Sequence, residues 1–545
     1  MDFPEIKRAL VSVYNKAGIV DFVKKLVDDF GIEILSTGGT ARILQEAGIP
    51  ITFVSDYTQS PEMFDGRVKT LHPRIHGGLL MRRDNQKDIE DAKKNNVLPI
   101  DMVVCNLYPF EDVIAREETT LEEAIEMIDI GGPTQIRAAA KSFPYVTVIP
   151  NPGYYDSILK EMHENQGKIS LQTRMKLAQQ VFSVMSLYDA TIANYLSNIY
   201  EEKFQTNVDE SESLPDIIHK TYKKVQTCRY GENWEQKAAY YKDPLSKAGL
   251  QNLKQLHGKA ISFNNWLDID SCIQVLLDFN VDHTKNHICA IFKHTTPNGI
   301  AIDYNSQLEA CKRAFSTDPL SAFGGIWGFN HVINKDVADY LVNKKKVFIE
   351  VLLAPDFDED ALNIFRTKKN IRIVKFGDLL SKREDIYKQH EIRGVLGGAL
   401  IQEYDWGPII KDWDPKTERK VSEREKEALI FAYRVSKWAK SNSAAFVKEY
   451  KTGIYTLGIG AGQQSRVHVV KLAAQKAIEF GHDLKDSVMG TDSFFPFPDG
   501  LIAATEVGAK AIINPGGSIR DEEIISKANE LGISLIFCGK RVFRH

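Results

Sequence analysis

Short apolar runs alternate with segments of helical periodicity along most of this chain, and that alternation constrains the fold more than any other feature. An apolar run at Ala9–Val13 is followed by Ile19–Phe30, in which apolar side chains recur every three or four residues. Ile32–Leu35 and the helical pattern Thr40–Ala47 repeat the pair. Strands that alternate with helices of this length form parallel sheets covered on both faces. The sequence therefore predicts an α/β fold.

The alternation of strand-like and helix-like segments continues along the rest of the chain. Further strands are expected at Ile51–Val54, Met102–Asn106, Val146–Ile149, Ile288–Lys293, Ala322–Phe329, Phe348–Leu353, Ile371–Val374, Ala444–Val447, Ile454–Ile459, Ala511–Ile513 and Ser534–Cys538. Helices are expected at Ser170–Tyr200 (one long helix or a pair), Ser422–Lys440, Ser465–Phe480 and Asp521–Leu531.

A polar, charge-rich stretch at Glu201–Lys224, which contains the string DESES, is typical of a surface linker. It indicates a first domain at 1–200, a linker at 201–226 and a second domain at 227–545. The second domain exceeds 300 residues, so two subdomains that meet at roughly 400–420 are expected within it.

Composition excludes several classes of protein. The chain of 545 residues has a net charge of −4 and 43% hydrophobic residues, which disfavours a disordered protein and a dedicated nucleic-acid binder. Its six cysteines include no C-x-x-C pair, so neither a zinc knuckle nor a disulfide framework is indicated. The first residues do not resemble a signal peptide, and no apolar run of about 18 residues suggests a membrane span. We therefore expect reduced core cysteines and a cytoplasmic protein without membrane or nucleic-acid partners.

Three motifs in the first part carry candidate chemistry. The string Ser36–Thr40 lies between a strand and a helix, where its glycines and N–H groups can cradle a phosphate, although many such turns bind nothing. The segment Gly66–Pro73 contains two cations and a histidine, and is either a solvated basic loop or an anion clamp. In the segment Asp129–Lys141, a Gly-Gly turn precedes Arg137 and Lys141, which are spaced to share one helix face.

Together the strings KTLHP, NLYPF (Asn106–Phe110) and IDIGGPTQIRAAAK (Ile128–Lys141) resemble the inosine monophosphate (IMP) cyclohydrolase domain of the bifunctional purine-biosynthesis enzymes. The resemblance implies a methylglyoxal-synthase-like domain with a parallel sheet. It also implies a catalytic set of Lys69, Tyr108, Asp129 and Lys141. Phosphate and ribose would be held by Ser12, Lys16, Ser36, Thr37, Gly38, Thr40 and Arg67.

In the second part, a Lys-His pair at Lys293 and His294 ends an expected strand, where it can supply a cation beside a proton acceptor. An isolated pair of this kind is more often incidental. Further strings follow in the order DPLSAFGG, VLLAPDFDEDAL, KSNS, GIGAGQQSR, DSFFPFPDG, NPGGSIRD and RVFRH. This series resembles the aminoimidazole carboxamide ribonucleotide (AICAR) transformylase half of the same family, so the resemblance covers nearly the whole chain.

The transformylase resemblance implies tandem cytidine-deaminase-like α/β subdomains and a second set of site residues. Lys293, His294 and Asn442 would be catalytic, and the substrate-binding residues would be Arg229, Tyr230, Asn265, Phe494, Asp499 and Arg541. The co-substrate would be 10-formyltetrahydrofolate, which donates its formyl group to AICAR, and the cyclohydrolase would then close the formamido product to IMP. The resemblance also implies a homodimer that shares transformylase sites between chains. It is compatible with a structural monovalent cation.

Two other site classes can be rejected from the sequence. The glycines of Gly458–Gly462 imitate a dinucleotide-binding turn but lack the G-x-G-x-x-G spacing. The H-x-E and P-C-x-x-C signature of zinc deaminases is missing, so no catalytic metal is expected.

The chain departs from the family at three positions. Trp234 and Glu235 replace a proline and a histidine, and Pro498 replaces an arginine. Two alternatives therefore stay open: a first domain that only binds an effector, and a cyclohydrolase whose transformylase half is impaired.

Overall fold

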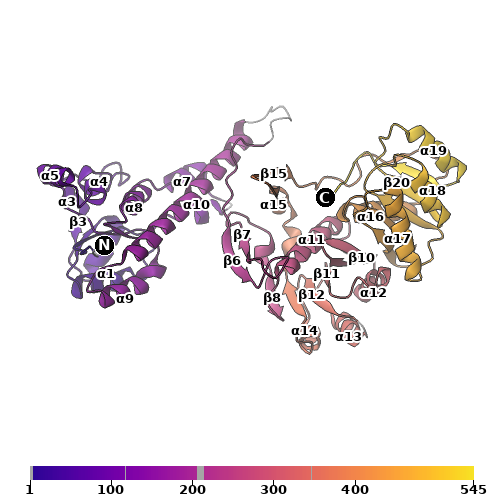
Figure 1. Cartoon of the computed structure of the whole chain (residues 1–545), viewed down its shortest axis with the longest axis horizontal. Helices are drawn as coiled ribbons and strands as arrows, with labels where there is room; N and C mark the ends of the chain where they lie inside the picture. The colour runs from indigo at the N-terminus through magenta and orange to yellow at the C-terminus, as the bar shows by residue number, and fades with distance from the viewer. Residues whose placement is uncertain (1–3, 117, 205–213, 345–346) are drawn as a thin grey trace. The chain divides into compact units, whose positions relative to one another are not determined.

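The computed structural model describes residues 4–116, 118–204, 214–344 and 347–545. The chain divides into two compact units, Met1–Thr221 and Tyr222–His545 (Figure 1). Each unit has its own sheet and its own apolar core.

The first unit is built on a parallel sheet with the strand order β3-β2-β1-β4-β5. The strands are β1 (Arg8–Val11), β2 (Glu33–Ser36), β3 (Thr52–Phe53), β4 (Met102–Val104) and β5 (Thr147–Ile149). The helices are α1 (Ile19–Asp28), α2 (Gly38–Glu46), α3 (Val54–Thr58), α4 (Pro73–Leu80), α5 (Gln86–Lys94), α6 (Phe110–Ile114), α7 (Leu121–Glu126), α8 (Gly131–Lys141), α9 (Tyr155–Glu164) and α10 (Leu171–Phe204).

The strand order places β1 at the centre, paired in parallel with β2 on one side and β4 on the other. The chain order reverses at β1, so the loops after β1, β2 and β4 meet at one edge of the sheet. In open α/β sheets ligands bind at such an edge. The fold thus predicts where the first site lies.

Two expectations for the first unit need correction. The strand expected at Ile51–Val54 is only two residues long, because Val54 already begins α3. Of the two alternatives for Ser170–Tyr200, the single long helix is confirmed; this helix, α10, runs on to Phe204, so the linker expected from residue 201 begins later. Part of that linker, 205–213, lies outside the described residues.

The second unit contains a single twelve-stranded mixed sheet, in the order β16-β21-β20-β19-β17-β18-β10-β9-β11-β12-β13-β8. These strands are β8 (Lys254–His257), β9 (His287–Lys293), β10 (Thr296–Asp303), β11 (Gly325–Phe329), β12 (Ile349–Ala354), β13 (Arg372–Lys375), β16 (Asp414–Pro415), β17 (Ala444–Tyr450), β18 (Gly453–Gly460), β19 (Ser487–Thr491), β20 (Ala509–Asn514) and β21 (Ser534–Phe537). Two separate hairpins pair β6 (Lys223–Cys228) with β7 (Ala238–Lys242), and β14 (His390–Val395) with β15 (Gly398–Glu403).

Helices cover both faces of this sheet. One face packs on α11 (Phe263–Asn280) and α16 (Glu423–Trp438). The other packs on α12 (Gln307–Thr317), α13 (Lys335–Asn343), α14 (Glu359–Arg366), α17 (Arg466–Glu479), α18 (Asp499–Glu506) and α19 (Asp521–Glu530). The remaining short helix is α15 (Arg383–Tyr387).

The sheet is two similar halves joined by the antiparallel pair β10–β18. Each half contributes a hairpin (β9–β10 or β17–β18) followed by alternating helices and parallel strands. A glycine allows the same close packing in both halves. A Cβ at Gly299 would lie 2.0 Å from the carbonyl oxygen of Ala314, and a Cβ at Gly458 would lie 2.2 Å from that of Ala473. Gly458 therefore serves helix packing rather than a nucleotide.

All six cysteines are buried and none forms a disulfide. None of the described helices combines the length and the apolarity that crossing a bilayer would require.

Candidate active sites

A cavity of about 730 Å³ lies at the predicted edge of the first sheet. It is bordered by the loops after β1, β2 and β4, by the segment around Lys69, and by the start of α8. The predicted residues that line it are Ser12, Lys16, Thr37, Gly38, Thr40, Arg67, Lys69, Tyr108 and Asp129. The fold thus gathers nine of the predicted residues from five separate segments.

The first turn of α2 provides an anion cradle. Thr37 is the residue before this turn; its hydroxyl donates to Glu62 Oε1 at 2.8 Å and accepts no N–H group of α2. The backbone N–H groups of the first turn are therefore available to a ligand. Two ammonium side chains flank them: a Cβ at Gly38 would lie 3.2 Å from Lys69 Nζ, and one at Gly39 would lie 3.8 Å from Lys16 Cε.

Two cations of this cavity, Lys69 and Arg67, have carboxylate neighbours, whereas the Lys16 ammonium donates to the carbonyls of Val13 and Tyr14. Lys69 Nζ lies 3.7 Å from Glu62 Oε2, and Arg67 forms an ion pair with Glu126. These side chains are partly exposed, so the pairs are weak and can be exchanged for a substrate anion. Sequence reasoning did not single out Glu62 or Glu126.

Asp129 also lines the cavity, two residues before the start of α8. Its Oδ1 accepts the backbone N–H of Gly132 at 2.9 Å, and a Cβ at that position would lie 2.5 Å from Oδ2, which explains the glycine of the motif. Burial raises the pKa of Asp129, and N–H donors from Gly132, Tyr108 and Gly131 oppose the shift. A carboxyl held this way can exchange a proton nearer to neutral pH than an exposed one.

Tyr108 stands beside Asp129 with its ring half exposed. Burial and the neighbouring charge of Asp129 raise the pKa of its phenol, so the hydroxyl remains a proton donor at neutral pH. Asn106 fixes the loop that carries it, because its Oδ1 accepts the N–H groups of Tyr14 at 2.8 Å and Asn15 at 2.7 Å.

Cys105 also borders this cavity but is not a nucleophile. Burial, together with the charge of Asp129, raises the pKa of its thiol to about 12, although a hydrogen bond from Gln135 opposes the shift. A thiol that stays protonated at neutral pH is unreactive.

Two predicted residues lie outside this cavity. Ser36 is fully buried and its hydroxyl donates to the Val11 carbonyl at 2.7 Å, so it shapes the sheet edge from behind. Lys141 is exposed at the other end of α8, roughly 15 Å along the helix from Gly131. Arg137, on the same helix, pairs with Asp189 of α10.

In the second unit, Lys293 is the last residue of β9, at the strand end that the sequence predicts, and His294 and Thr295 form the turn to β10. His294 and Thr295 both have positive φ angles, of 55° and 59°. Asp268 of α11 holds this turn, because its Oδ1 accepts the Thr295 N–H at 2.6 Å. Burial raises the pKa of Asp268, while N–H donors from Thr295 and His294 and the charges of His294 and Lys293 oppose the shift.

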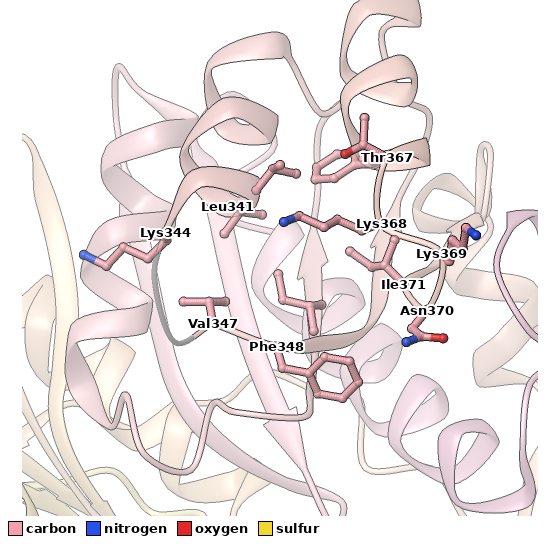
Figure 2. A pocket seen from close by; sticks show the side chains of 12 residues that line it. Leu341, Lys344, Val347, Phe348, Thr367, Lys368, Lys369, Asn370 and Ile371 are labelled. Carbon is pink, nitrogen blue, oxygen red and sulfur yellow. The ribbon is translucent and has the colours of Figure 1, made fainter.

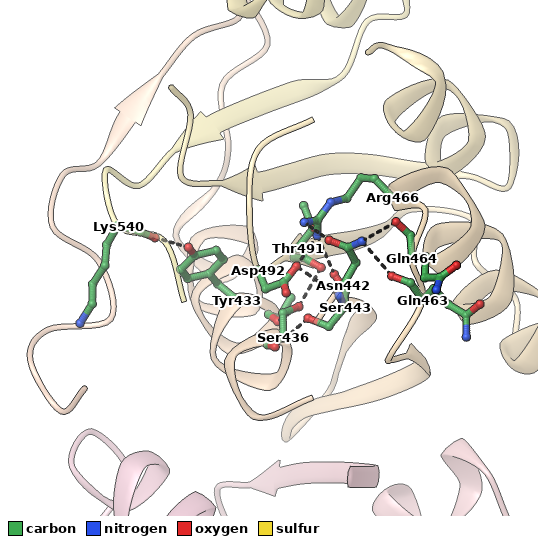
Figure 3. Close-up of polar contacts among 12 residues, drawn as sticks. Tyr433, Ser436, Asn442, Ser443, Gln463, Gln464, Arg466, Thr491, Asp492 and Lys540 are labelled. Atoms are coloured by element: carbon green, nitrogen blue, oxygen red, sulfur yellow. Dashed lines mark hydrogen bonds and ion pairs between the residues drawn. The ribbon is translucent and has the colours of Figure 1, made fainter. Parts of the chain in front are cut away.

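Asn442 lies at the same edge of the sheet, because β10 pairs with β18 and β18 with β17. Figure 3 shows its side chain within a polar cluster. Its Nδ2 donates to the carbonyls of Gln463 at 2.8 Å and Gln464 at 3.1 Å, and its Oδ1 accepts from Arg466 Nη2 at 2.6 Å. Arg466 also forms an ion pair with the fully buried Asp492. Arg466 and Asp492 were not predicted from the sequence.

A cavity of about 260 Å³ lies between the two predicted segments of this edge. It is lined by Thr296, Pro297, Asn298, Lys440, Ile459, Ala461, Gly462, Leu472 and Lys476. Lys476 Nζ pairs with Asp318 Oδ2 at 3.1 Å, so Lys440 is the cation of this lining that has no carboxylate partner among the described residues. Lys293 does not point its ammonium freely into solvent, because Nζ donates to the Phe323 carbonyl at 2.8 Å.

The other predicted transformylase residues have fewer contacts that connect them to the Lys293–His294 pair. Phe494 and Asp499 follow β19, and the end of β19 pairs with the start of β17. Arg541 lies in the C-terminal segment, which contacts the same region because the Val542 N–H donates to the Asp492 carbonyl. Asn265 lies in the first turn of α11, where it exchanges hydrogen bonds with the N-cap residue Ser262. Arg229 lies over the ring of Tyr230 after β6, and no contact joins this pair to His294 among the described residues.

The departures from the family are mostly at exposed positions. Trp234 is 85% exposed and Glu235 is also exposed. Pro498 is the residue before α18. None of them contacts the Lys293–His294 turn within the part of the chain that the structure describes.

Among the described residues, no group of three or more His, Cys, Asp or Glu side chains is arranged to hold a metal ion.

Comparisons with known proteins agree with this organisation. A family model described as AICARFT/IMPCHase bienzyme matches residues 139–476, and one described as MGS-like domain matches residues 18–134. Curated relatives from Caldicellulosiruptor bescii and Caldicellulosiruptor saccharolyticus are both named bifunctional purine biosynthesis protein PurH. Each is 45% identical over 542 residues, which cover 99% of this chain and 100% of the relative.

A solved structure described as the crystal structure of ForH is 29% identical, covering 35% of this chain and 97% of that chain with a TM-score of 0.32. That overlap bears on neither fold nor function. The family match covers more than half of the chain, and the relatives match nearly all of it. The chain therefore belongs to the AICARFT/IMPCHase bienzyme family.

Proposed function

We propose that this chain catalyses two reactions of purine biosynthesis, one in each compact unit. Residues 222–545 transfer the formyl group of 10-formyltetrahydrofolate to AICAR, and residues 1–221 close the formamido product to IMP with loss of water. The observation that carries this proposal is the pair of separate sites, with Lys293–His294 at the sheet edge of one unit and Lys69–Asp129 at that of the other. Family membership supports both activities.

Formyl transfer needs a base and a cation at the reacting centre. The amine of AICAR is a poor nucleophile, since its lone pair is delocalised into the ring and the carboxamide. His294 takes the amine proton as the nitrogen attacks the formyl carbon, and Lys293 stabilises the oxyanion that forms there. When this intermediate collapses, the bond from the formyl carbon to the folate nitrogen breaks, and that nitrogen takes the proton back from His294 as tetrahydrofolate leaves. Asn442, whose side-chain amide is fixed by three hydrogen bonds, positions the reacting groups. Arg229, Tyr230, Asn265, Phe494, Asp499 and Arg541 are proposed to bind the nucleotide and the folate.

Ring closure is intramolecular, so holding the reactive rotamer supplies much of the rate. The α2 cradle with Lys16 and Arg67 holds the phosphate. Asp129 and Tyr108 move protons at the ring-closing carboxamide nitrogen and the formyl oxygen, and Lys69 stabilises the tetrahedral oxyanion. Lys141 lies outside this cavity and is given no step.

The raised pKa of Asp129 favours ring closure over mere effector binding, because a passive site has no need of a proton-exchanging carboxyl next to a phenol. Exposure of Trp234 and Glu235 away from the Lys293–His294 turn favours an active transformylase half. A cytoplasmic homodimer is proposed from the family alone.

The direct test is to incubate the purified chain with AICAR and 10-formyltetrahydrofolate and to follow tetrahydrofolate and IMP separately. Both should accumulate. Formation of tetrahydrofolate without IMP would contradict the cyclohydrolase assignment, and ring closure of added formamido nucleotide without formyl transfer would contradict the transformylase assignment.

A further inference from the structure

The second unit contains a further cavity of about 450 Å³, bordered by Leu341, Phe348 and Lys368 (Figure 2). Lys344 and Val347 both line it, and the two residues between them lie outside the described part of the chain. No ligand is therefore assigned to this cavity. A loop of the first unit carries the inference instead.

That loop, residues 62–69, brings Glu62 and Lys69 together. Met63 and Val68 form an antiparallel bridge, in which the N–H of each donates to the carbonyl of the other at 3.2 Å. The residues just outside such a bridge face each other, and Glu62 Oε2 accordingly lies 3.7 Å from Lys69 Nζ. Gly66 leaves room for the lysine, because a Cβ at this position would lie 2.7 Å from Nζ.

Glu62 is fixed from a second side by the residue that precedes the phosphate cradle of α2. The buried Thr37 hydroxyl donates to Oε1 of Glu62 at 2.8 Å, while Lys69 is the neighbour of Oε2. Each oxygen of one carboxylate therefore contacts a different segment, so Glu62 connects the loop to the start of α2.

Glu62 stands behind the cavity rather than in it. Thr37 and Lys69 line the cavity, whereas Glu62 is not among the residues that line it. Any effect of Glu62 on a bound substrate therefore passes through these two neighbours. A phosphate on the cradle has a charge between about −1.5 and −2 at neutral pH, and it competes with the Glu62 carboxylate for the same ammonium.

Lys69 lies between two parts of the cavity. Its ammonium is next to the cradle, since a Cβ at Gly38 would lie 3.2 Å from Nζ. The following residue, Thr70, is next to the start of α8, since a Cβ at Gly131 would lie 3.3 Å from its Oγ1. The proposed ring closure uses Lys69 at the tetrahedral oxyanion, so an ammonium drawn fully onto the phosphate would no longer serve that step.

We propose that Glu62 is a positioning residue, which limits how far the substrate phosphate draws Lys69 onto the α2 cradle and so keeps the ammonium available to the oxyanion. This inference rests on the proposed ring closure and adds a residue that acts without touching the substrate. The side chains of Lys69 and Glu62 are 30% and 42% exposed, so their pairing is weak. Glu62 therefore shifts the position of Lys69 by a small factor and does not lock it.

The test compares the full-length wild type with Glu62→Gln, using the formamido nucleotide as substrate and inorganic phosphate as inhibitor of ring closure. Without the carboxylate, Lys69 should move toward the phosphate. The inhibition constant of inorganic phosphate should then fall about two- to fivefold, the usual effect of one partly exposed charge pair, and kcat should fall by a similar factor. Tighter phosphate binding together with slower turnover is diagnostic, because a merely structural defect would weaken both.

Two further variants serve as controls. Glu62→Asp keeps the charge, and its phosphate inhibition constant should stay closer to that of the wild type than the constant of Glu62→Gln. Glu5→Gln is the matched control, because it removes the carboxylate of another exposed lysine pair of the same unit, 3.0 Å from Lys7 Nζ, and should change neither constant.

Unchanged or weaker phosphate binding in Glu62→Gln, or a wild-type kcat in that variant, would overturn the role of Glu62. A wild type that failed to close the formamido nucleotide would instead contradict the proposed function. Calorimetric binding of inorganic phosphate to the wild type and to Glu62→Gln needs no turnover, so it would still decide whether Glu62 restrains Lys69.

Discussion

Asp268 accepts the backbone N–H of Thr295 at 2.6 Å, and thereby joins the start of α11 to the turn that carries His294. The turn needs such a partner, because His294 and Thr295 both adopt left-handed backbone conformations that non-glycine residues rarely adopt. Asp268 is thus a positioning residue for the proposed base, and it lies 26 residues before it in the sequence.

Replacing Asp268 by Asn should lower formyl transfer by roughly tenfold, because losing one charged hydrogen bond costs about 1.5 kcal/mol. The loss should fall mainly on kcat, since no proposed substrate contact is removed. Steady-state rates of formyl transfer and ring closure on the same preparation are the measurement. An unchanged kcat for formyl transfer would mean that the turn keeps its shape without the carboxylate.

Arg466 links Asn442 to the buried Asp492, so its removal should affect both stability and formyl transfer. Removing one partner of a buried ion pair costs about 3–5 kcal/mol, and Arg466→Leu should destabilise the second unit by that amount in denaturant unfolding. Arg466→Lys keeps the charge but not the forked geometry, and should be less destabilised while still losing formyl transfer. Wild-type formyl transfer in the Lys variant would show that Asn442 does not depend on Arg466.

The raised pKa of Asp129 has a consequence for stability as well as for activity. The folded chain binds this proton more tightly than the unfolded chain, so this carboxyl lowers the free energy of unfolding as pH rises above about 4. Asp129→Asn should therefore lose ring closure by about 10²–10⁴-fold yet unfold at an equal or higher temperature at pH 7. The gain should shrink as pH falls and vanish near about pH 3, where the wild-type carboxyl is mostly protonated in both the folded and the unfolded chain.

Thermal unfolding of Asp129→Asn at the two pH values tests whether the ionised Asp129 carboxyl lowers the free energy of unfolding. A variant that unfolds at a clearly lower temperature than the wild type at pH 7 would show that the N–H donors of Gly132, Tyr108 and Gly131 outweigh the cost of burial.

The sequence predicted the strands best where they are fully buried. Ile288–Lys293 and Ile454–Ile459 are continuous apolar runs, and they became β9 and β18. It missed β10, whose first residues include Pro297 and Gly299, two residue types that are depleted in strands; they form a strand because β9 and β18 pair with β10 on its two sides. Tertiary pairing here overrides local propensity.

Site residues with charged side chains in motifs could be predicted, whereas their partners could not. Lys69 and Asp129 stand in recognisable strings, and both line the first cavity. Glu62 and Asp268 act through contacts with residues 25 and 27 positions away, which no local pattern reveals. Ser36 shows the opposite case, because it belongs to the string expected to bind phosphate but is buried outside the cavity, with its hydroxyl donated to the Val11 carbonyl.

The separation of the two reactions is tested most directly by measuring both half-reactions in two single variants of the full-length chain, Lys69→Ala and His294→Ala. The account predicts that His294→Ala loses formyl transfer by at least roughly two orders of magnitude, with only modestly weaker nucleotide binding, and closes the formamido nucleotide at the wild-type rate. Lys69→Ala should show the reverse pattern. If either variant lost both activities, or if neither lost its own, the assignment of one reaction to each unit would be contradicted.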